Sequence, residues 1–349
     1  MRVMHVMAGA VEGGAENIML ESVLALGEAG HVQHVVTRPD NAFRIGKFEA
    51  AGIGTDTAGF NAAWPFGTRR VIASAIKAFK PDVIEYWMDG AGQFAPARHS
   101  ARSVAWYDGQ YKPTRFKACD WHVGLTTGLL RYIREQGISE DRSAIIHTYA
   151  DFEGVEPIDR ASLSTPERAP VALSLARLNK KKGLDTLLEA AMRLPDLYVW
   201  VSGDGPIEAE LKAQTKRLGL DHRVRFLGWR NDRGALLAAC DVVACPSRAD
   251  MFGTVTVDAW AAGRPLVATD TPGQAAYMKD GVNGLLVAKN DVDALASALG
   301  RVVYDKTFAQ KLVAGGRASY EAQFTKAAFQ RDSLAFYEQV RAHAGPFGG

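Results

Sequence analysis

The stretch of sequence that decides the fold is VALSLARLNKKKGLDTLLEAAMRLPDLYVWVSGDGP, residues 171–206. An apolar run, VALSLARL, leads through a lysine-rich turn into a segment expected to be helical. A second apolar run, YVWVSG, then ends in a glycine turn. Short apolar runs bounded by turns are typical of buried strands. Two such strands joined by a helix need a crossover connection, so they are expected to lie parallel in one sheet.

The same alternation of strands and helices extends over nearly the whole chain. Upstream, we expect strands at residues 2–7, 31–37 and 81–86, and helices at residues 15–29 and 69–79. The second helix has apolar residues at helical spacing. These patterns predict an α/β protein built on parallel sheets.

The rhythm is interrupted once, at residues 151–170, where Pro, Ser and charged residues accumulate. The chain has 349 residues, enough for two domains. We therefore predict a first domain at residues 1–160 and a second at residues 161–325. The pattern is helical from Phe324 onward, which predicts a C-terminal helix and tail at residues 326–349, with the helix crossing back to the first domain.

Composition excludes several classes of protein. The 41 basic and 39 acidic residues give a formal charge of +2, so no strong field favours nucleic acid as a partner. The three cysteines form neither a disulfide framework nor a paired metal motif, and a reduced, cytoplasmic setting is the simplest interpretation. The N-terminal apolar run is shorter than the roughly 20 residues that span a bilayer, and it lacks a convincing cleavage site.

A glycine-rich loop follows the first expected strand, in the segment GAVEGGAEN, residues 9–17. Gly13 and Gly14 carry no Cβ, so an anion or a sugar can approach the backbone and the positive end of the next helix closely. The glycine spacing differs from the dinucleotide fingerprint GxGxxG. A plain tight turn that caps the helix explains the loop as well.

In the deciding stretch, one cation lies near the end of the strand VALSLARL and another follows shortly after it. Arg177 lies near the end of that strand, and Lys182 precedes Gly183 and a helix. Two cations at the carboxyl end of a parallel strand, beside a helix N-terminus, suit a diphosphate. The other lysines of the run are expected to be solvated. The turn with Gly203 and Gly205 lies over the same edge, where an ordinary strand-to-helix turn is the alternative.

Two acids flank a glycine in the segment PSRADMFGTVTVDAWAAGRPLVAT, residues 246–269. Asp250 and Asp258 enclose seven residues, which include Phe252, Gly253 and Thr254. An ionised carboxylate accepts two directed hydrogen bonds from a vicinal diol, so such a pair can hold sugar hydroxyls. The alternative is one capping Asp and one exposed helical Asp. Periodicity alone would misplace this segment, because residues 254–257 alternate like a strand.

Taken in order, these motifs resemble the retaining glycosyltransferases of family 4. The shared features are GGAE at residues 13–16, Arg177 with Lys182-Gly183, GDGP at 203–206, FLG at 226–228, Pro246-Ser247, the acid pair around Phe252-Gly253, and the stretch from Ala259 to Pro265. The resemblance covers residues 1 to about 337 and is strongest at residues 171–287. It implies the GT-B architecture: two Rossmann-like domains whose parallel sheets face a central cleft.

The resemblance also implies roles for individual residues. Arg177 and Lys182 would neutralise the leaving nucleoside diphosphate without a metal or other cofactor, Asp258 would hold the ribose, and Asp250 would contact the donor sugar. Further donor-side candidates are Gly13, Gly14, Gly203, Gly205, Trp229, Arg230, Phe252, Gly253 and Thr254. On the acceptor side the candidates are Glu16, Tyr107 and Asp108. The sugar would transfer with retention along a front-face path, so no protein nucleophile is expected.

The chain departs from the family pattern at three places. Both acids of the pair are Asp where the family usually has Glu, and the Glu expected after the next glycine turn is replaced by Ala276. Many members have a histidine in the first domain at the position of Tyr107 or Asp108. His99 and His122 are nearby in sequence but do not occupy that position.

The function implied is transfer of a sugar from a nucleoside-diphosphate sugar, UDP- or GDP-linked, to a glycan or glycolipid acceptor of bacterial surface polysaccharide, of the lipopolysaccharide type. Base, sugar and acceptor stay open. The alternatives are a catalytically silent nucleotide-sugar-binding protein and a nicotinamide-dependent oxidoreductase. The missing GxGxxG and Arg38 after the second strand argue against the oxidoreductase.

Peripheral contact with an anionic membrane surface is a further expectation. The residues that predict it are Trp64, Phe66, Arg69, Arg70, Lys77, Lys80, Arg98, Arg102, Lys112, Arg115 and Lys117. Basic residues near an anionic leaflet attract it electrostatically. The alternative is that the apolar face of the helix at residues 69–79 packs on the sheet while the charges are solvated.

Overall fold

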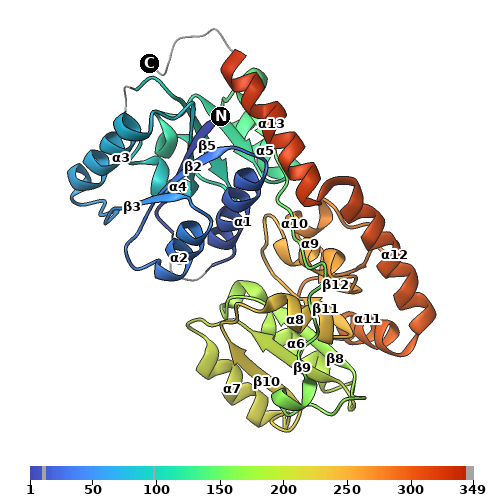
Figure 1. The fold of residues 1–349 in the computed structure, drawn as a ribbon. Helices are drawn as coiled ribbons and strands as arrows, with labels where there is room; N and C mark the ends of the chain where they lie inside the picture. The colour runs from blue at the N-terminus through green and yellow to red at the C-terminus, as the bar shows by residue number, and fades with distance from the viewer. Residues whose placement is uncertain (10–12, 97–98, 343–349) are drawn as a thin grey trace. The chain divides into compact units, whose positions relative to one another are not determined.

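The computed structural model describes residues 1–9, 13–96 and 99–342, and the chain divides into two compact units (Figure 1). The first unit contains Met1–Thr148 and the C-terminal segment that begins at Lys326, and the second contains Tyr149–Thr325. Each unit has its own parallel sheet, which confirms the predicted α/β class.

The first unit is built on a seven-stranded sheet with the order β3-β2-β1-β4-β5-β6-β7. Its strands are β1 (Arg2–Met7), β2 (Val32–Thr37), β3 (Gly54–Thr57), β4 (Val83–Trp87), β5 (Arg102–Tyr107), β6 (Trp121–Gly124) and β7 (Ser143–Ile145). Its helices are α1 (Gly14–Glu28), α2 (Ala42–Ala50), α3 (Pro65–Phe79), α4 (Met88–Gly92), α5 (Thr127–Glu135) and α13 (Lys326–Ala342), with 3₁₀ turns η1 (Pro113–Phe116) and η2 (Glu140–Arg142).

The strands and helices predicted for this unit are present, with small shifts at their ends. Helix α3 begins at Pro65, one turn before the predicted residue 69. Proline is favoured in the first helical turn because its missing N–H has no intrahelical acceptor there and its φ is already helical. Ile72 and Ala75 of this helix are buried, so its apolar face packs within the unit.

The second unit is built on a six-stranded sheet with the order β10-β9-β8-β11-β12-β13. Its strands are β8 (Val171–Leu175), β9 (Tyr198–Ser202), β10 (Val224–Gly228), β11 (Val242–Cys245), β12 (Leu266–Thr269) and β13 (Leu285–Val287). Its helices are α6 (Leu184–Ala191), α7 (Glu208–Arg217), α8 (Arg233–Ala239), α9 (Thr254–Ala261), α10 (Pro272–Ala275), α11 (Val292–Tyr304) and α12 (Lys306–Gln323), with 3₁₀ turns η3 (Arg160–Leu163) and η4 (Lys180–Lys182).

Residues 254–257, whose alternation resembles a strand, form the start of helix α9. Gly253 precedes the helix with φ 73°, a left-handed conformation that glycine adopts without steric cost. Most of α9 is buried, including Thr256, Val257 and Trp260. A helix buried on several sides does not show a clean helical period, which explains the misleading pattern.

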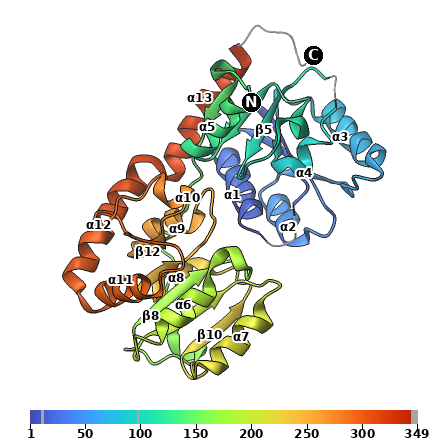
Figure 2. The same cartoon turned by 180° about the vertical axis from the view of Figure 1, so that it is seen from behind.

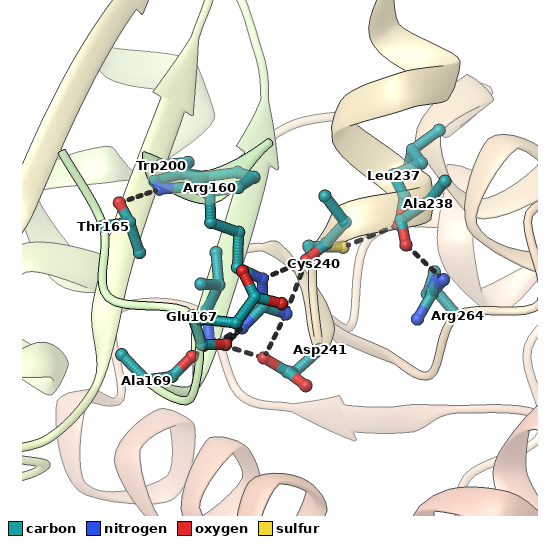
Figure 3. Close-up of polar contacts among 12 residues, drawn as sticks. Arg160, Thr165, Glu167, Ala169, Trp200, Leu237, Ala238, Cys240, Asp241 and Arg264 are labelled. Atoms are coloured by element: carbon teal, nitrogen blue, oxygen red, sulfur yellow. Dashed lines mark hydrogen bonds and ion pairs between the residues drawn. The ribbon is translucent and has the colours of Figure 1, made fainter. Parts of the chain in front are cut away.

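The segment at residues 151–170 is an ordered part of the second unit, so the boundary between units lies after Thr148 and not at residue 160. Arg160 attaches this segment: its guanidinium donates to the Ala239 carbonyl at 2.9 Å. It also pairs with Asp241 at 3.0 Å, a contact drawn in Figure 3. The Trp200 indole donates to Thr165 Oγ1 at 2.9 Å. Polar side chains that suggested a linker therefore satisfy backbone and side-chain groups along the sheet.

Helix α13 packs in the first unit beside α1, as both views show (Figures 1 and 2). Gln330 Nε2 donates to the Ala25 carbonyl at 2.7 Å, and Lys326 pairs with Glu28 at 3.1 Å. The last helix of the chain therefore completes the first unit.

A buried polar network joins α13 to the first sheet. The Tyr337 hydroxyl donates to Glu85 Oε1 at 2.6 Å, and Glu85 Oε2 lies 3.0 Å from His5 Nδ1. His5 Nε2 is bonded to Gln33 Oε1 at 2.5 Å. Glu85 and His5 are fully buried, where a carboxylate is tolerated only with partners. Burial and the neighbouring Glu85 raise the pKa of Tyr337 well above its usual value, so this hydroxyl stays a donor.

Replacing Tyr337 by phenylalanine is expected to lower the free energy of unfolding by about 2 kcal/mol, because Glu85 Oε1 then loses its donor in a buried site. The matched control is Tyr320→Phe, whose hydroxyl donates to the neutral carbonyl of Ala150 at 2.8 Å in the second unit. That loss should cost about 1 kcal/mol. Urea unfolding of the two variants measures both changes in the free energy of unfolding. Equal decreases in the two variants would contradict the special role of the Glu85 contact.

Candidate active site

The candidate site of the second unit lies at the carboxyl ends of its parallel strands, where the loops after β8, β9, β10 and β11 follow. Gly203 and Gly205, after β9, have φ of 138° and 151°. A Cβ on either glycine would collide with the carbonyl of Ala176 or Leu178, so the loop after β9 presses directly on the loop after β8. Close packing of two backbones therefore explains this glycine turn, whether or not a ligand is bound.

The two predicted cations both follow β8 and differ in their surroundings. Arg177 is exposed, and its guanidinium makes no ion pair or hydrogen bond within the described parts of the chain. Lys182 is partly buried, and its Nζ lies 2.7 Å from Asp250 Oδ2. Burial of Lys182 favours the neutral amine, but Asp250 outweighs it and raises the pKa of Lys182. Two cations thus lie at this edge, and the described residues provide a counter-charge for Lys182.

Lys180 of the same run behaves as expected for a solvated residue. It is exposed and lies 3.8 Å from the exposed Glu210. Arg248 fixes the turn from the other side: it makes two contacts of 2.7 Å with Asp185 and donates to the Lys180 carbonyl at 2.8 Å. Although partial burial favours the neutral acid, Arg248 lowers the pKa of Asp185. Motif inspection missed Arg248, whose role depends on a partner far away in sequence.

Asp250 organises the loop that leads into α9. Its Oδ1 accepts hydrogen bonds from the backbone N–H of Gly253 at 2.9 Å and of Phe252 at 3.3 Å, while Oδ2 pairs with Lys182. Phe252 is buried and packs edge-on against Tyr277, so its side chain belongs to the core. Thr254 opens the helix, whose first N–H groups lack intrahelical acceptors. The carboxylate thus connects Lys182 to this helix start.

Asp258, the second acid of the pair, is buried on α9 and faces α8. Its Oδ2 lies 3.5 Å from Arg233 Nε. Burial raises the pKa of Asp258 above its usual value, and the Arg233 charge opposes that rise. Sequence reasoning missed Arg233, because no motif links positions so far apart in the chain. The alternative of an exposed helical Asp is wrong for this residue.

Trp229 and Arg230 follow β10 in a local turn. Arg230 makes two contacts with Asp232, at 2.7 and 2.5 Å, and these hydrogen bonds lower the pKa of Asp232. Trp229 Nε1 donates to Asn231 at 3.3 Å. Both side chains therefore stabilise the turn. Gly228 just before them accepts a hydrogen bond from the Gly203 N–H at 2.8 Å, which brings this loop beside the glycine turn.

In the first unit, Gly13 and Gly14 stand at the start of α1, and residues 10–12 of the same loop lie outside the described residues. A Cβ on Gly13 or on Gly9 would collide with the Glu16 carboxylate, which is buried against both glycines. An acid in the first helical turn is favourable there. Glu16 thus fills the space that the glycines provide.

The two residues at the position of the family's histidine have different environments. The Tyr107 hydroxyl is buried and bonded to His122 Nδ1 at 3.0 Å. Burial lowers the pKa of His122 to about 4, so this ring is neutral near pH 7. Asp108 accepts a hydrogen bond from the Tyr111 hydroxyl at 2.5 Å. Burial raises the pKa of Asp108, and the nearby carboxylates of Glu16 and Asp89 add to the rise.

Asp108 borders a small pocket in the first unit. Its other lining residues are Ala15, Ile18, Trp87, Met88, Trp106, Tyr107 and Leu125. The rings of Trp87 and Trp106 stack with centroids 4.4 Å apart. Tyr107 and Asp108 both line this pocket, and each is engaged by a neighbour, the Tyr107 hydroxyl by His122 and the Asp108 carboxylate by Tyr111, so both remain acceptor-side candidates. In the described residues, no group of three or more His, Cys, Asp or Glu is arranged to hold a metal ion.

Comparison with known proteins agrees with the motifs. Residues 155–319 match the model of the family described as glycosyl transferases group 1. The lipopolysaccharide core biosynthesis glycosyltransferase LpsE of Rhizobium meliloti (strain 1021) is 33% identical over 334 residues, which cover 94% of this chain and 96% of that protein. LpsD of the same organism is 29% identical, with 97% and 98% covered.

Solved structures share the fold at lower identity. Anabaena Alr3699/HepE, crystallised with UDP and glucose, superposes with a TM-score of 0.82 at 21% identity, covering 97% of this chain and 99% of that chain. WaaG, a glycosyltransferase involved in lipopolysaccharide biosynthesis, gives a TM-score of 0.71 at 15% identity, with 95% and 99% covered. These likenesses confirm the GT-B fold class.

This match to glycosyltransferases argues against both alternatives, the oxidoreductase and the catalytically silent binding protein. A relative one third identical aligns along nearly its whole length, so the chain belongs to the group 1 glycosyl transferases and is a glycosyltransferase.

Proposed function

We propose that this glycosyltransferase moves a sugar, with retention of configuration, from a nucleoside-diphosphate sugar to a glycan or glycolipid of the lipopolysaccharide core. The observation that carries the proposal is the pair of cations after β8, beside the start of α9: the exposed Arg177, which has no ion pair among the described residues, and the partly buried Lys182. The relatives named for lipopolysaccharide core biosynthesis support the acceptor class. HepE, solved with UDP and glucose, supports the donor class.

In this proposal the second unit binds the donor. Arg177 and Lys182 stabilise the charge that develops on the leaving diphosphate, which is where preorganised cations have their largest effect. Asp258 accepts hydrogen bonds from the ribose, and Asp250 contacts the donor sugar. The backbone of residues 228–230 borders the base. The leaving phosphate helps to deprotonate the acceptor on the same face, and neither a protein nucleophile nor a metal cofactor takes part.

The first unit binds the acceptor in this proposal. Asp108 lines the pocket, and its carboxyl group is held by Tyr111. A carboxyl group at the edge of an aromatic pocket can bind a sugar hydroxyl while the rings contact the apolar face of the sugar. Glu16 lies against Gly9 and Gly13 at this end of the sheet.

A thermal-shift screen with UDP-, GDP-, ADP- and CMP-sugars tests the donor class. A nucleotide sugar present at about 100 times its dissociation constant stabilises the folded protein by about 2.7 kcal/mol. We expect a shift with a UDP- or GDP-linked sugar, and retention is then read from the anomeric proton of the product by NMR. No shift with any diphosphate sugar, or an inverted product, would contradict the proposal.

Peripheral binding to an anionic membrane is the second part of the proposal. Trp64 and Phe66, at the start of α3, are 70% and 68% exposed and pack edge-on against each other. Arg69 and Arg70 follow one turn later and are exposed. Within the described residues, no helix is both long and apolar enough to cross a membrane.

Two of the basic residues predicted to face the membrane are not counted in this surface. Arg102 is buried, so it is not part of this surface, and Arg98 lies outside the described residues. The apolar face of α3 packs on the sheet, as the alternative interpretation stated. In this proposal the exposed pair Trp64 and Phe66 makes the apolar contact with the membrane instead.

Sedimentation with vesicles tests membrane binding. We expect binding to phosphatidylglycerol-containing vesicles at low salt and none to pure phosphatidylcholine, because each basic residue near an anionic surface contributes about 1 kcal/mol and salt screens it. The double variant Trp64→Ala/Phe66→Ala should bind about tenfold more weakly, since interfacial aromatic rings anchor proteins to bilayers. Phe43→Ala, which removes another exposed ring of the same unit, serves as control. Binding that ignores lipid charge would contradict this part.

A further inference from the structure

Arg233 and Asp258 form a partly buried pair from two helices of the second unit. Arg233 begins α8, and Asp258 lies in the middle of α9. Their side chains are 23% and 12% exposed, and Arg233 Nε is 3.5 Å from Asp258 Oδ2. The guanidinium also stacks over the ring of Phe152, with Cζ 5.2 Å from its centroid. The arginine therefore contacts both an aromatic face and the carboxylate.

Burial of a carboxylate without a counter-charge favours its neutral form, which accepts hydrogen bonds less strongly. At Asp258 burial acts in that direction, and Arg233 acts against it. Among the described residues, the charged side chain that acts on this carboxylate is Arg233. The neighbouring helix α12 meets α9 through Gly316, which lies against Trp260 and brings no charge at that contact.

The length of the side chain adds a second reason. Asp258 has one methylene less than the glutamate of the family pattern, so its carboxylate must be directed accurately to reach a diol. The contact of 3.5 Å from Arg233 Nε to Asp258 Oδ2 restrains the rotation of the carboxylate. An arginine forms such directed contacts because its donors are arranged in a rigid plane.

We propose that Arg233 is a positioning residue that holds Asp258 ionised and oriented toward the ribose of the bound nucleotide sugar. The proposal rests on the donor assignment made above and extends it to a residue outside the family motifs. Arg233 acts through Asp258, so its removal should change how donor binding depends on pH.

The test is isothermal titration of UDP-glucose and of GDP-mannose into the wild type, Arg233→Met, Arg233→Lys, Asp258→Asn and the double variant Arg233→Met/Asp258→Asn. In these donors both phosphates are esterified, so the ligand does not titrate near neutral pH. Arg233→Met keeps length and removes charge, and Arg233→Lys restores charge. The control is Arg193→Gln, which breaks an Arg–Asp pair of 2.7 Å with Asp293 elsewhere in the same unit.

We expect Arg233→Met to bind the donor about tenfold more weakly than the wild type at the acid end of the pH series and to recover toward wild-type affinity as pH rises. The sign follows because loss of the cation raises the pKa of the acid further, and higher pH restores the carboxylate. Arg233→Lys should return most of the affinity. Asp258→Asn should bind weakly at every pH, and the double variant should bind no more weakly than Asp258→Asn.

An unchanged pH profile in Arg233→Met, or losses that simply add in the double variant, would overturn the role of Arg233 while the wild type still binds donor. Failure of Arg233→Lys to recover affinity, in a folded variant, would overturn it as well. A wild type that binds neither donor nor any nucleotide sugar of the screen would overturn the donor assignment, and this role with it.

Discussion

Replacing Arg177 or Lys182 by alanine is expected to lower kcat by about 10²–10³-fold, with the fold intact, because each removes a cation aimed at the charge that develops on the leaving diphosphate. Arg177 is exposed, so its loss leaves no buried group unpaired. Lys182→Ala also leaves Asp250 without its ion pair, and its effect should therefore be the larger of the two. Steady-state kinetics with the donor identified by the thermal-shift screen measures kcat of both variants.

Lys180→Ala is the matched control. Lys180 belongs to the same turn, but it is exposed and pairs with Glu210, whereas Lys182 contacts Asp250. It should retain at least about half of the wild-type rate, as expected for a surface substitution. The same assay with EDTA tests the predicted independence of metal: the rate should not change. A rate abolished by EDTA and restored by Mn²⁺, or equal losses in all three variants, would contradict the two-cation assignment.

Replacing Asp250 by asparagine is expected to slow transfer by about 100-fold and to leave binding of the free nucleoside diphosphate equal or tighter. Asparagine keeps an oxygen for the N–H groups of Phe252 and Gly253, so the start of α9 should be preserved. The negative charge next to Lys182 is lost, which frees this cation for the diphosphate. The donor-sugar contact weakens at the same time, because a neutral amide accepts less strongly than a carboxylate.

Titration calorimetry with UDP and with UDP-glucose, or the corresponding GDP pair, separates the two effects. The ratio of donor affinity to nucleotide affinity should fall by about tenfold in Asp250→Asn, equivalent to about 1.4 kcal/mol. Asp241→Asn is the control, since that carboxylate lies in the contact with Arg160 and not in the lysine turn. Equal losses for nucleotide and donor would contradict a contact between Asp250 and the sugar.

The parts of this protein that could be predicted from sequence are those that short-range patterns encode. Apolar runs of strand length alternate with segments whose apolar residues have helical spacing, and this alternation predicted two units with parallel sheets. The prediction was possible because the buried positions of a strand or an amphipathic helix can be recognised from the residues of that segment alone. The motifs from Arg177 to Pro265 predicted the enzyme class, because glycines that allow close approach and charges at strand ends recur at fixed offsets from their own strand.

The sequence by itself thus determined the α/β class, the order of the elements and the family of the enzyme. Only the tertiary structure decided that residues 151–170 belong to the second unit, that Arg233 faces Asp258, and that the Tyr107 hydroxyl meets His122. These contacts join elements far apart in the chain. Their partners are chosen by which helices and loops pack together, and neither composition nor spacing within one segment contains that information.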